Sequence, residues 1–264
     1  MTLAVEQLGF GYRGRPVGRE VTFTLAAGEV LCLLGPNGGG KTTLFKTLLG
    51  LIPSQAGRVR LEGEDIALWS RRRLAQSVAY VPQAPAVFFP FTVRDIVLMG
   101  RTARIALFAT PTAHDRAAAE AALQSLGIGH LAERVYTEIS GGERQLALIA
   151  RALAQEPRVM VMDEPTASLD FGNQVRVLQH LRRLAAQGIA VVLSTHDPDH
   201  AFLCADRVAL LHDGRLVALG SPEATITAAS LRLLYGVEVA VVRLAGENRH
   251  VCVPSLAPPL SRVT

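Results

Sequence analysis

The most informative segment of this 264-residue chain reads Gly35-Pro36-Asn37-Gly38-Gly39-Gly40-Lys41-Thr42. It fits the pattern G-x-x-x-x-G-K-S/T and lies between an apolar, strand-like run at 29–34 and a helix-like segment at 41–51. Glycines let the backbone curl so that several N–H groups point at phosphate oxygens, and the helix N-terminus behind them attracts negative charge. The segment therefore predicts a phosphate-binding loop, in which Lys41 faces the β and γ phosphates and the Thr42 hydroxyl can ligate Mg²⁺.

On either side of this loop, strand-like and helix-like segments alternate. Further strand-type runs lie at 78–81, 159–162 and 189–193; helices are expected at 173–186 and, within a helical stretch from 92 to 155, at 113–126. This order predicts an α/β fold whose parallel sheet is interrupted by a helical insertion. Two short β-type runs, 237–244 and 251–253, precede a proline-rich end at 254–259 that we expect to be frayed.

Composition excludes several classes of protein. A hydrophobic fraction of 49% with 19% charged residues suits a packed core rather than a disordered chain. No apolar run approaches the roughly 18 residues that suggest a membrane span. No secretory signal is visible at the start, and Cys32, Cys204 and Cys252 form no C-x-x-C pair. We therefore expect a soluble, intracellular chain in a reducing compartment.

The charge balance is basic but decides little. The net charge is +4, and all of the 27 basic residues except Lys41 and Lys46 are scattered arginines. We interpret this as a solvated surface; attraction to an anionic membrane or an acidic partner stays open. Aromatic residues make up only 5% of the chain, so stacking surfaces for nucleic acid are scarce.

A second apolar run, Val159-Met160-Val161-Met162, ends in Asp163 and Glu164. Successive side chains of a strand face opposite ways, so adjacent acids can hold different roles. We expect Asp163 to face the phosphate loop and hold Mg²⁺ through water. Glu164 would polarise the attacking water as a general base, a role typically worth about 10²–10⁴ in rate.

The segment Ser140-Gly141-Gly142-Glu143 predicts both a helix start and a second anion site. Ser140 and Glu143 have the spacing of a capping box, and the following helix would bury Leu146, Ile149, Ala150 and Leu153. A cap needs no Gly-Gly, and glycine costs roughly 1 kcal/mol in a helix relative to Ala. Two glycines instead leave backbone N–H groups uncovered for an anion. We infer that this segment binds the nucleotide held by another copy of the chain.

Together with Ile139, Ser168-Leu169-Asp170 and His196, these motifs resemble the ATP-binding-cassette ATPase family over about residues 3–235. Glu143 stands where the family usually has glutamine, and Ile139 where it usually has leucine; both changes are mild. The resemblance implies a P-loop NTPase core with a parallel sheet, an N-terminal antiparallel β part and an inserted helical subdomain at about 84–157. The ATPase domain would span 1–236, with a short C-terminal extension at 237–264.

The resemblance also implies individual roles. Tyr12 matches an adenine-stacking aromatic, with a core tyrosine as the alternative, and Gln83 matches the glutamine that touches Mg²⁺ and the attacking water. Asp170 matches an aspartate at the dimer seam, and His196 the histidine that contacts the γ-phosphate. Independently of the family, Gln83, Asp163 and His196 each follow a strand-like run, so they should meet at the carboxyl edge of a parallel sheet.

ATP and Mg²⁺ are thus the expected cofactors. The expected catalytic residues are Lys41, Gln83, Glu164 and His196, and the expected Mg²⁺ ligands are Thr42, Gln83 and Asp163. The residues expected to bind nucleotide are Tyr12, Gly35, Pro36, Asn37, Gly38, Gly39, Gly40, Lys41, Thr42, Thr43, Ser140, Gly141, Gly142, Glu143 and Asp170. A rival interpretation makes His196 and His200 metal ligands, but Pro198 disrupts a regular helix between them and no third ligand is suggested.

Within the family, the segments 91–101, 142–145 and 170–174 look most like ATPases of bacterial importers for ferric siderophores, haem, cobalamin or molybdate. The resemblance implies a homodimer beneath a polytopic permease dimer at the cytoplasmic face of the inner membrane, fed by an extracytoplasmic substrate-binding protein. The alternatives are an exporter ATPase, a nucleic-acid-linked ATPase, and a regulatory subunit without turnover. We expect no nucleic-acid partner, and the complete set of Lys41, Asp163, Glu164 and His196 argues against a subunit without turnover.

A cluster of large apolar residues lies between Gln83 and Arg101, with one member just beyond: Val87, Phe88, Phe89, Phe91 and Phe108. We hypothesise that part of it lines the groove that receives the permease. Ordinary core of the helical insertion is the alternative.

Overall fold

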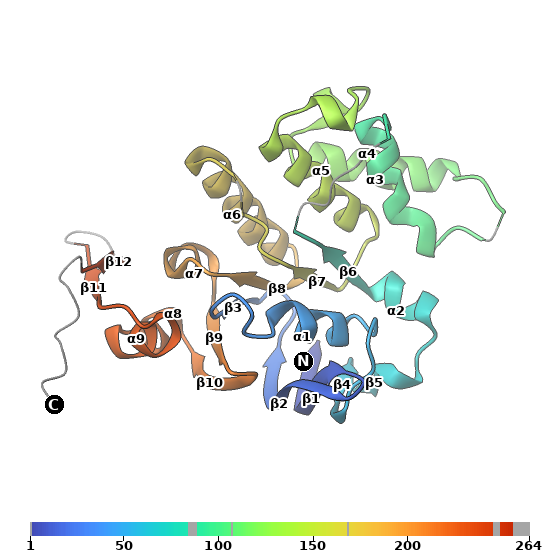
Figure 1. Cartoon of the computed structure of the whole chain (residues 1–264). Helices are drawn as coiled ribbons and strands as arrows, with labels where there is room; N and C mark the ends of the chain where they lie inside the picture. The colour runs from blue at the N-terminus through green and yellow to red at the C-terminus, as the bar shows by residue number, and fades with distance from the viewer. Residues whose placement is uncertain (1, 84–88, 107, 168, 245–248, 256–264) are drawn as a thin grey trace, which may run out of the picture.

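The computed structural model describes residues 2–83, 89–106, 108–167, 169–244 and 249–255 (Figure 1). Over these residues the strands form a six-stranded sheet in the order β10-β9-β3-β8-β7-β6, a four-stranded sheet in the order β2-β1-β4-β5, and a ribbon of β11 and β12. The expected α/β fold, with a parallel sheet and antiparallel strands near the N-terminus, is confirmed.

The six-stranded sheet carries the core of the molecule. Its strands are β3 (Val30–Leu34), β6 (Val78–Val81), β7 (Val159–Met162), β8 (Ala190–Thr195), β9 (Arg207–His212) and β10 (Arg215–Gly220). All neighbours pair in parallel except β9 and β10. Every residue of β3, β7 and β8 is buried, as expected for a parallel sheet covered on both faces. The carboxyl ends of these strands therefore meet at one edge.

The second sheet is antiparallel and covers one side of the core. It contains β1 (Leu3–Tyr12), β2 (Arg15–Leu25), β4 (Ala56–Leu61) and β5 (Glu64–Asp65). Its apolar face packs with α1 (Lys41–Leu48) around Phe10, Leu44 and Phe45. Helix α1 ends three residues earlier than the sequence predicts, because Gly50 adopts a left-handed conformation with φ of 63° and terminates it.

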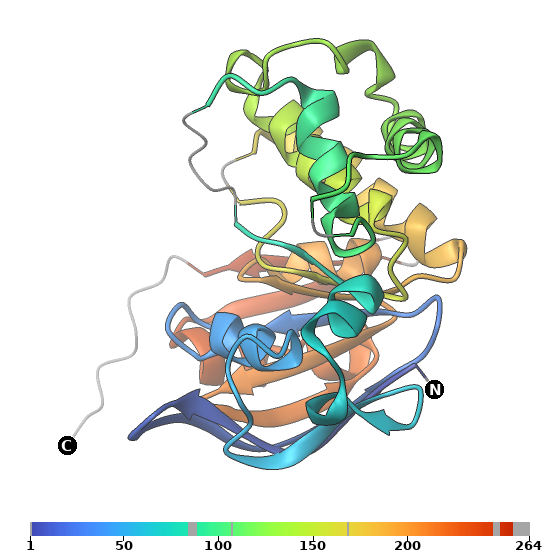
Figure 2. The same cartoon turned by 90° about the vertical axis from the view of Figure 1, so that its right-hand side faces the viewer.

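Three helices of the insertion gather away from the antiparallel sheet (Figure 2). They are α3 (Val93–Leu98), α4 (Ala113–Ser125) and α5 (Gly141–Ala154). Outside this group, α2 (Arg71–Ser77) precedes β6. Short 3₁₀ helices lie at Ile66–Leu68, Met99–Ala103, Gly129–Leu131 and Tyr136–Glu138. Capping boxes start α3, α4 and α5. In α5, Ile149 and Ala150 are buried as expected, whereas Leu146 and Leu153 are half-buried because the core lies mainly beneath the neighbouring positions.

A buried arginine ties this group of helices together. Arg101 is 2% exposed, and its Nε lies 3.0 Å from Asp115 Oδ1 on α4. Its Nη1 donates to the Ala154 carbonyl oxygen at 2.8 Å and lies 2.7 Å from Glu156 Oε2. The guanidinium thus joins the segment after α3 to α4 and to the end of α5.

The remaining elements include the helix expected at 173–186 and the two late β-runs, and three helices that the sequence did not predict, α7 (Pro198–Cys204), α8 (Pro222–Thr225) and α9 (Ala228–Tyr235). Helix α6 (Phe171–Ala186) is capped by Asp170 and is followed, after β8, by α7, then α8, α9, β11 (Val239–Arg243) and β12 (His250–Pro254). The ribbon packs on α7 (Figure 1): the Cys252 N–H donates to Asp199 Oδ1 at 2.8 Å, and His250 stacks on Phe202. The proline-rich end lies outside the described residues from 256 onward. None of the described helices is long and apolar enough to span a bilayer.

Candidate nucleotide site

The phosphate loop connects β3 to α1 and depends on its glycines. Gly38 and Gly40 have φ of 81° and 98°, a conformation that other residues rarely adopt. A Cβ on Gly35 would lie 2.3 Å from the carbonyl oxygen of Leu211, so no larger residue fits there. The sequence folds this way locally because only glycine allows both the turn and the close approach of β9.

Lys41 at the start of α1 lies inside the loop. Its Nζ donates to the carbonyl oxygens of Gly35 (2.8 Å) and Pro36 (3.0 Å) and lies 3.8 Å from Glu164 Oε1. Burial lowers the pKa of Lys41, while Glu164 and Asp163 oppose that shift. The ammonium thus stands between its own loop and the acids after β7, where it can reach a phosphate by exchanging carbonyl bonds.

The two acids after β7 are held by Thr42 and by a residue that the sequence analysis missed. Thr42 Oγ1 donates to Asp163 Oδ2 at 2.6 Å, and Ser194 Oγ donates to Asp163 Oδ1 at 2.7 Å. The Glu164 N–H donates to the same Ser194 hydroxyl at 2.9 Å, and Glu164 has a left-handed φ of 48°. Ser194 therefore positions both acids. The signal for it was a polar residue at the end of an apolar run just before His196.

His196 completes this group from the end of β8. Its Nδ1 lies 3.2 Å from Glu164 Oε2, and its carbonyl oxygen accepts a hydrogen bond from the Tyr235 hydroxyl at 3.2 Å. His200 lies on the first turn of α7 and is buried, with Nδ1 3.2 Å from Thr166 Oγ1 and Nε2 3.3 Å from Asp197 Oδ2.

In the part of the chain that the structure describes, no three His, Cys, Asp or Glu side chains gather as metal ligands. The geometry gives no support to the interpretation of His196 and His200 as a metal pair.

A polar cavity of about 590 Å³ opens over the phosphate loop. It brings together residues from five separate segments: Tyr12, Arg15, Pro16, Val17, Asn37, Gly38, Gly40, Lys41, Thr42, Thr43, Gln83, Asp163 and Glu164. Tyr12 is 45% exposed at the rim, with its hydroxyl 3.5 Å from Lys46 Nζ, which argues against a core tyrosine. Gln83 is exposed and follows β6. The cavity thus collects three of the four expected catalytic residues, all but His196, and seven of the fifteen expected nucleotide-binding residues. Arg15, Pro16 and Val17 from the start of β2 line it in addition.

The oxygen donors of this cavity suit Mg²⁺. The Thr42 hydroxyl and the Asp163 carboxylate lie within hydrogen-bond distance of each other, and the Gln83 amide lines the same cavity. A hard cation that keeps several of its waters takes such a set of hydroxyl, carboxylate and amide oxygens. These residues fit the cation predicted from the sequence.

The segment at the start of α5 lies outside this cavity. Ser140 Oγ accepts from the Glu143 N–H, and Glu143 Oε2 accepts from the Ser140 N–H at 2.8 Å, so the expected capping box forms. Gly142 packs on α6, where an added Cβ would lie 2.4 Å from Asn173 Cγ. Asn173 in turn donates to Asp170 Oδ2 at 2.7 Å. The structure therefore joins α5 to the Asp170 cap in a second group, separate from the phosphate loop; Ser168 lies outside the described residues.

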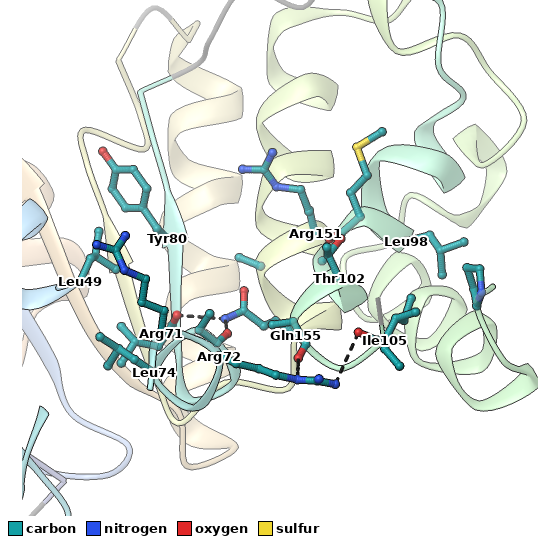
Figure 3. Close-up of a pocket in the computed structure, with 18 of the residues that line it drawn as sticks. Leu49, Arg71, Arg72, Leu74, Tyr80, Leu98, Thr102, Ile105, Arg151 and Gln155 are labelled. Carbon is teal, nitrogen blue, oxygen red and sulfur yellow. Dashed lines mark hydrogen bonds between the residues drawn. The ribbon is translucent and has the colours of Figure 1, made fainter. Parts of the chain in front are cut away.

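A larger, mainly apolar groove of about 1320 Å³ lies between the core and the helical insertion (Figure 3). Phe91 and Phe108 line it and are 39% and 97% exposed, and Phe89 is exposed with its ring 6.0 Å from that of Phe91. These three residues are not core, contrary to the alternative interpretation. Val87 and Phe88 lie outside the described residues.

Known proteins match nearly the whole chain. The family model described as ABC transporter matches residues 19–167. An ABC transporter ATP-binding protein of Haemophilus influenzae is 44% identical over 235 residues, covering 89% of each chain. The hemin import ATP-binding protein HmuV of Nocardia farcinica is 42% identical over 234 residues, covering 88% of this chain and 80% of that protein. Among solved structures, a metal-chelate type ABC transporter in an inward-facing conformation matches with a TM-score of 0.86 and 36% identity, covering 96% of this chain and 97% of that one.

Proposed function

We propose a function from one premise: the chain belongs to the ABC transporter family. It is the ATP-hydrolysing subunit of an importer, and its cargo is a metal chelate such as haem. The observation that carries this assignment is one connected group of hydrogen bonds, Thr42–Asp163–Ser194–Glu164–His196, beside the Lys41 loop. The cargo class is supported by the likeness to a hemin import protein and to a metal-chelate transporter.

Hydrolysis follows from the placement of these side chains. Lys41 exchanges its bonds to loop carbonyls for phosphate oxygens, which it stabilises as charge develops. Thr42, Asp163 and Gln83 would hold Mg²⁺, which supplies charge neutralisation on the phosphates when bound. Glu164 takes the proton of the attacking water, and His196, 3.2 Å from its carboxylate, orients that carboxylate.

The second group of motif residues belongs to a neighbouring copy in this proposal. Ser140, Gly142 and Asp170 lie together but away from the chain's own phosphate loop. Two chains packed head to tail would each complete the other's site, with the uncovered N–H groups of α5 facing the partner's phosphates. Closure would assemble the sites, and hydrolysis with phosphate release would open them.

The transport path belongs to another chain. The groove beside α5 is the docking place for a membrane permease, since its exposed Phe91 and Phe108 form an apolar face that needs a partner. The ATPase then sits peripherally at the cytoplasmic face of the membrane, and a substrate-binding protein delivers cargo to the permease from the other side.

Two measurements test the function. Purified wild-type chain should release phosphate from Mg²⁺-ATP, Lys41→Ala should not, and Lys46→Ala, which changes the other lysine, should keep most of the activity. Tagged Glu164→Gln chain, purified with ATP from membranes of the source cell, should bring down a polytopic permease. A wild-type chain without ATPase activity contradicts the catalytic proposal, and purely soluble or nucleic-acid partners contradict the transport proposal.

The cargo is tested on the purified transporter. Its binding protein should bind haem, cobalamin, a ferric siderophore or molybdate, and vesicles carrying the complex should accumulate that ligand on the ATPase side. Movement of the ligand in the opposite direction would identify an exporter.

A further inference from the structure

The groove carries positive charge that the described part of the chain leaves unmatched. Its walls are mainly apolar, with Leu49, Leu51, Leu74, Leu98, Met99 and Ile105 among the lining residues. Three arginines also line it, Arg71, Arg72 and Arg151, against a single carboxylate, Asp95. That carboxylate is already engaged, because Asp95 Oδ2 accepts from the Thr92 hydroxyl at 2.7 Å and from the Thr92 N–H at 3.1 Å in the cap of α3.

The three arginines differ in how they are held. Arg72 extends along the floor, where its guanidinium donates to the carbonyl oxygens of Ala103 and Arg104 at 3.0 and 3.1 Å. Arg151 extends from α5 toward the wall that carries Tyr80 and Arg71 (Figure 3). Among the described residues neither the Arg151 nor the Arg71 guanidinium makes a hydrogen bond or has a carboxylate within ion-pair distance. These two cations are the unmatched ones.

Arg151 is the more significant of the two because it is half-buried. The surrounding protein removes part of the hydration of the guanidinium, and this burial lowers the pKa of Arg151. A partly desolvated cation gains from an anion brought to it, and it rejects a partner that offers none. Tyr80 also lines the groove, and its neutral hydroxyl can donate to an anion; burial and the charge of Asp163 raise the pKa of Tyr80 to about 12.

We propose that the groove selects a helical segment of the permease that carries a carboxylate on its apolar face, and that Arg151 binds this carboxylate. The inference rests on the proposed function, since it takes a permease as the occupant. The apolar walls bury the segment and Arg151 fixes its register, with Arg71 and Tyr80 supplying further donors. The same segment with an amide or a lysine at that position would leave Arg151 buried without a counter-charge.

The test uses the complete chain and the permease that purifies with it. Arg151→Glu should weaken the binding of detergent-solubilised permease to immobilised chain by about thirtyfold or more, as expected when a buried ion pair is broken. Arg151→Lys should keep most of the affinity. The matched control is Arg183→Glu, the same change at an exposed position of α6 away from the groove, and it should bind as wild type. Basal ATP hydrolysis should stay within about twofold in all three variants, which shows that they fold.

Charge reversal in the partner identifies the carboxylate. Each Asp and Glu in the cytoplasmic segments of the permease is changed to Lys in turn, and one of these changes should restore binding to Arg151→Glu while weakening binding to wild type. Equal binding by Arg151→Glu and Arg183→Glu overturns the proposal, as does the absence of any restoring change, although the permease assignment would stand. If the wild-type chain binds no permease, the proposed function fails and this inference fails with it.

Discussion

The polar cavity and the apolar groove differ in whether their polar groups already have hydrogen-bond partners. In the cavity, polar groups are already bonded to one another: Lys41 to loop carbonyls, Thr42 to Asp163, and His196 to Glu164. In the groove, the Arg151 guanidinium has no such partner among the residues that the structure describes, and large apolar side chains are exposed. A small polar ligand that enters the cavity can replace the internal hydrogen bonds one by one. The groove is too large for that, and it needs a partner protein whose surface is already shaped to cover it. The difference indicates that chemistry and docking can be changed separately.

The largest expected effect is a loss of ATP hydrolysis without a loss of permease binding. Glu164→Gln removes the general base, so ATP hydrolysis should fall about 10²–10⁴-fold while ATP binding persists. The same variant should accumulate as an ATP-bound dimer, measured by size-exclusion chromatography with light scattering, and should hold the permease as wild type does. A variant that stays monomeric in saturating ATP contradicts the head-to-tail dimer, and one with near-normal hydrolysis contradicts the role of Glu164.

The second largest effect is expected from removing Arg101, which holds together the helices on one side of the groove. Arg101→Met takes the buried guanidinium from Asp115 and Glu156, so the free energy of unfolding should fall by about 3 kcal/mol. Urea denaturation measures this change, with the exposed Arg183→Met as the control expected to lie within about 0.5 kcal/mol of wild type. A loss as small as that of the control would show that Arg101 does not hold the insertion together.

A smaller effect is expected from changing Ser194, which positions Asp163 and Glu164. Ser194→Ala leaves Asp163 Oδ1 and the Glu164 N–H without their shared partner, so kcat should fall about tenfold while KM for ATP stays nearly constant. Steady-state kinetics separate the two parameters. A rise in KM at constant kcat would instead mean that Ser194 contributes to nucleotide binding and not to the placement of Glu164.

The smallest effect on hydrolysis is expected from the groove. Phe91→Ser and Phe108→Ser remove apolar walls from the docking surface, so basal ATP hydrolysis should stay within about twofold of wild type. Transport in reconstituted vesicles should be lost, because the permease no longer seats. Phe89→Ser, at an exposed neighbour that does not line the groove, is the matched comparison. Full transport by the Phe91 and Phe108 variants would contradict docking at this surface.

Much of this molecule could be predicted from the sequence because the information is local. The family resemblance and the expected transport-coupled ATPase are confirmed, and both rest on short motifs whose spacing carries the chemistry. Ser194 was not predicted, because its bond to Asp163 joins residues 31 positions apart and depends on the parallel pairing of β7 and β8. The contact between Gly142 and Asn173 and the groove between two units depend on tertiary packing in the same way.

The left-handed backbone at Glu164 has an evolutionary consequence. A non-glycine residue held at φ of 48° costs on the order of 1–3 kcal/mol, which the surrounding fold must offset. Asparagine tolerates this conformation better, so replacing the glutamate with asparagine should make the chain more heat-resistant as it becomes inactive. Stability alone would therefore favour asparagine at position 164, and an acid is expected there only where turnover is required.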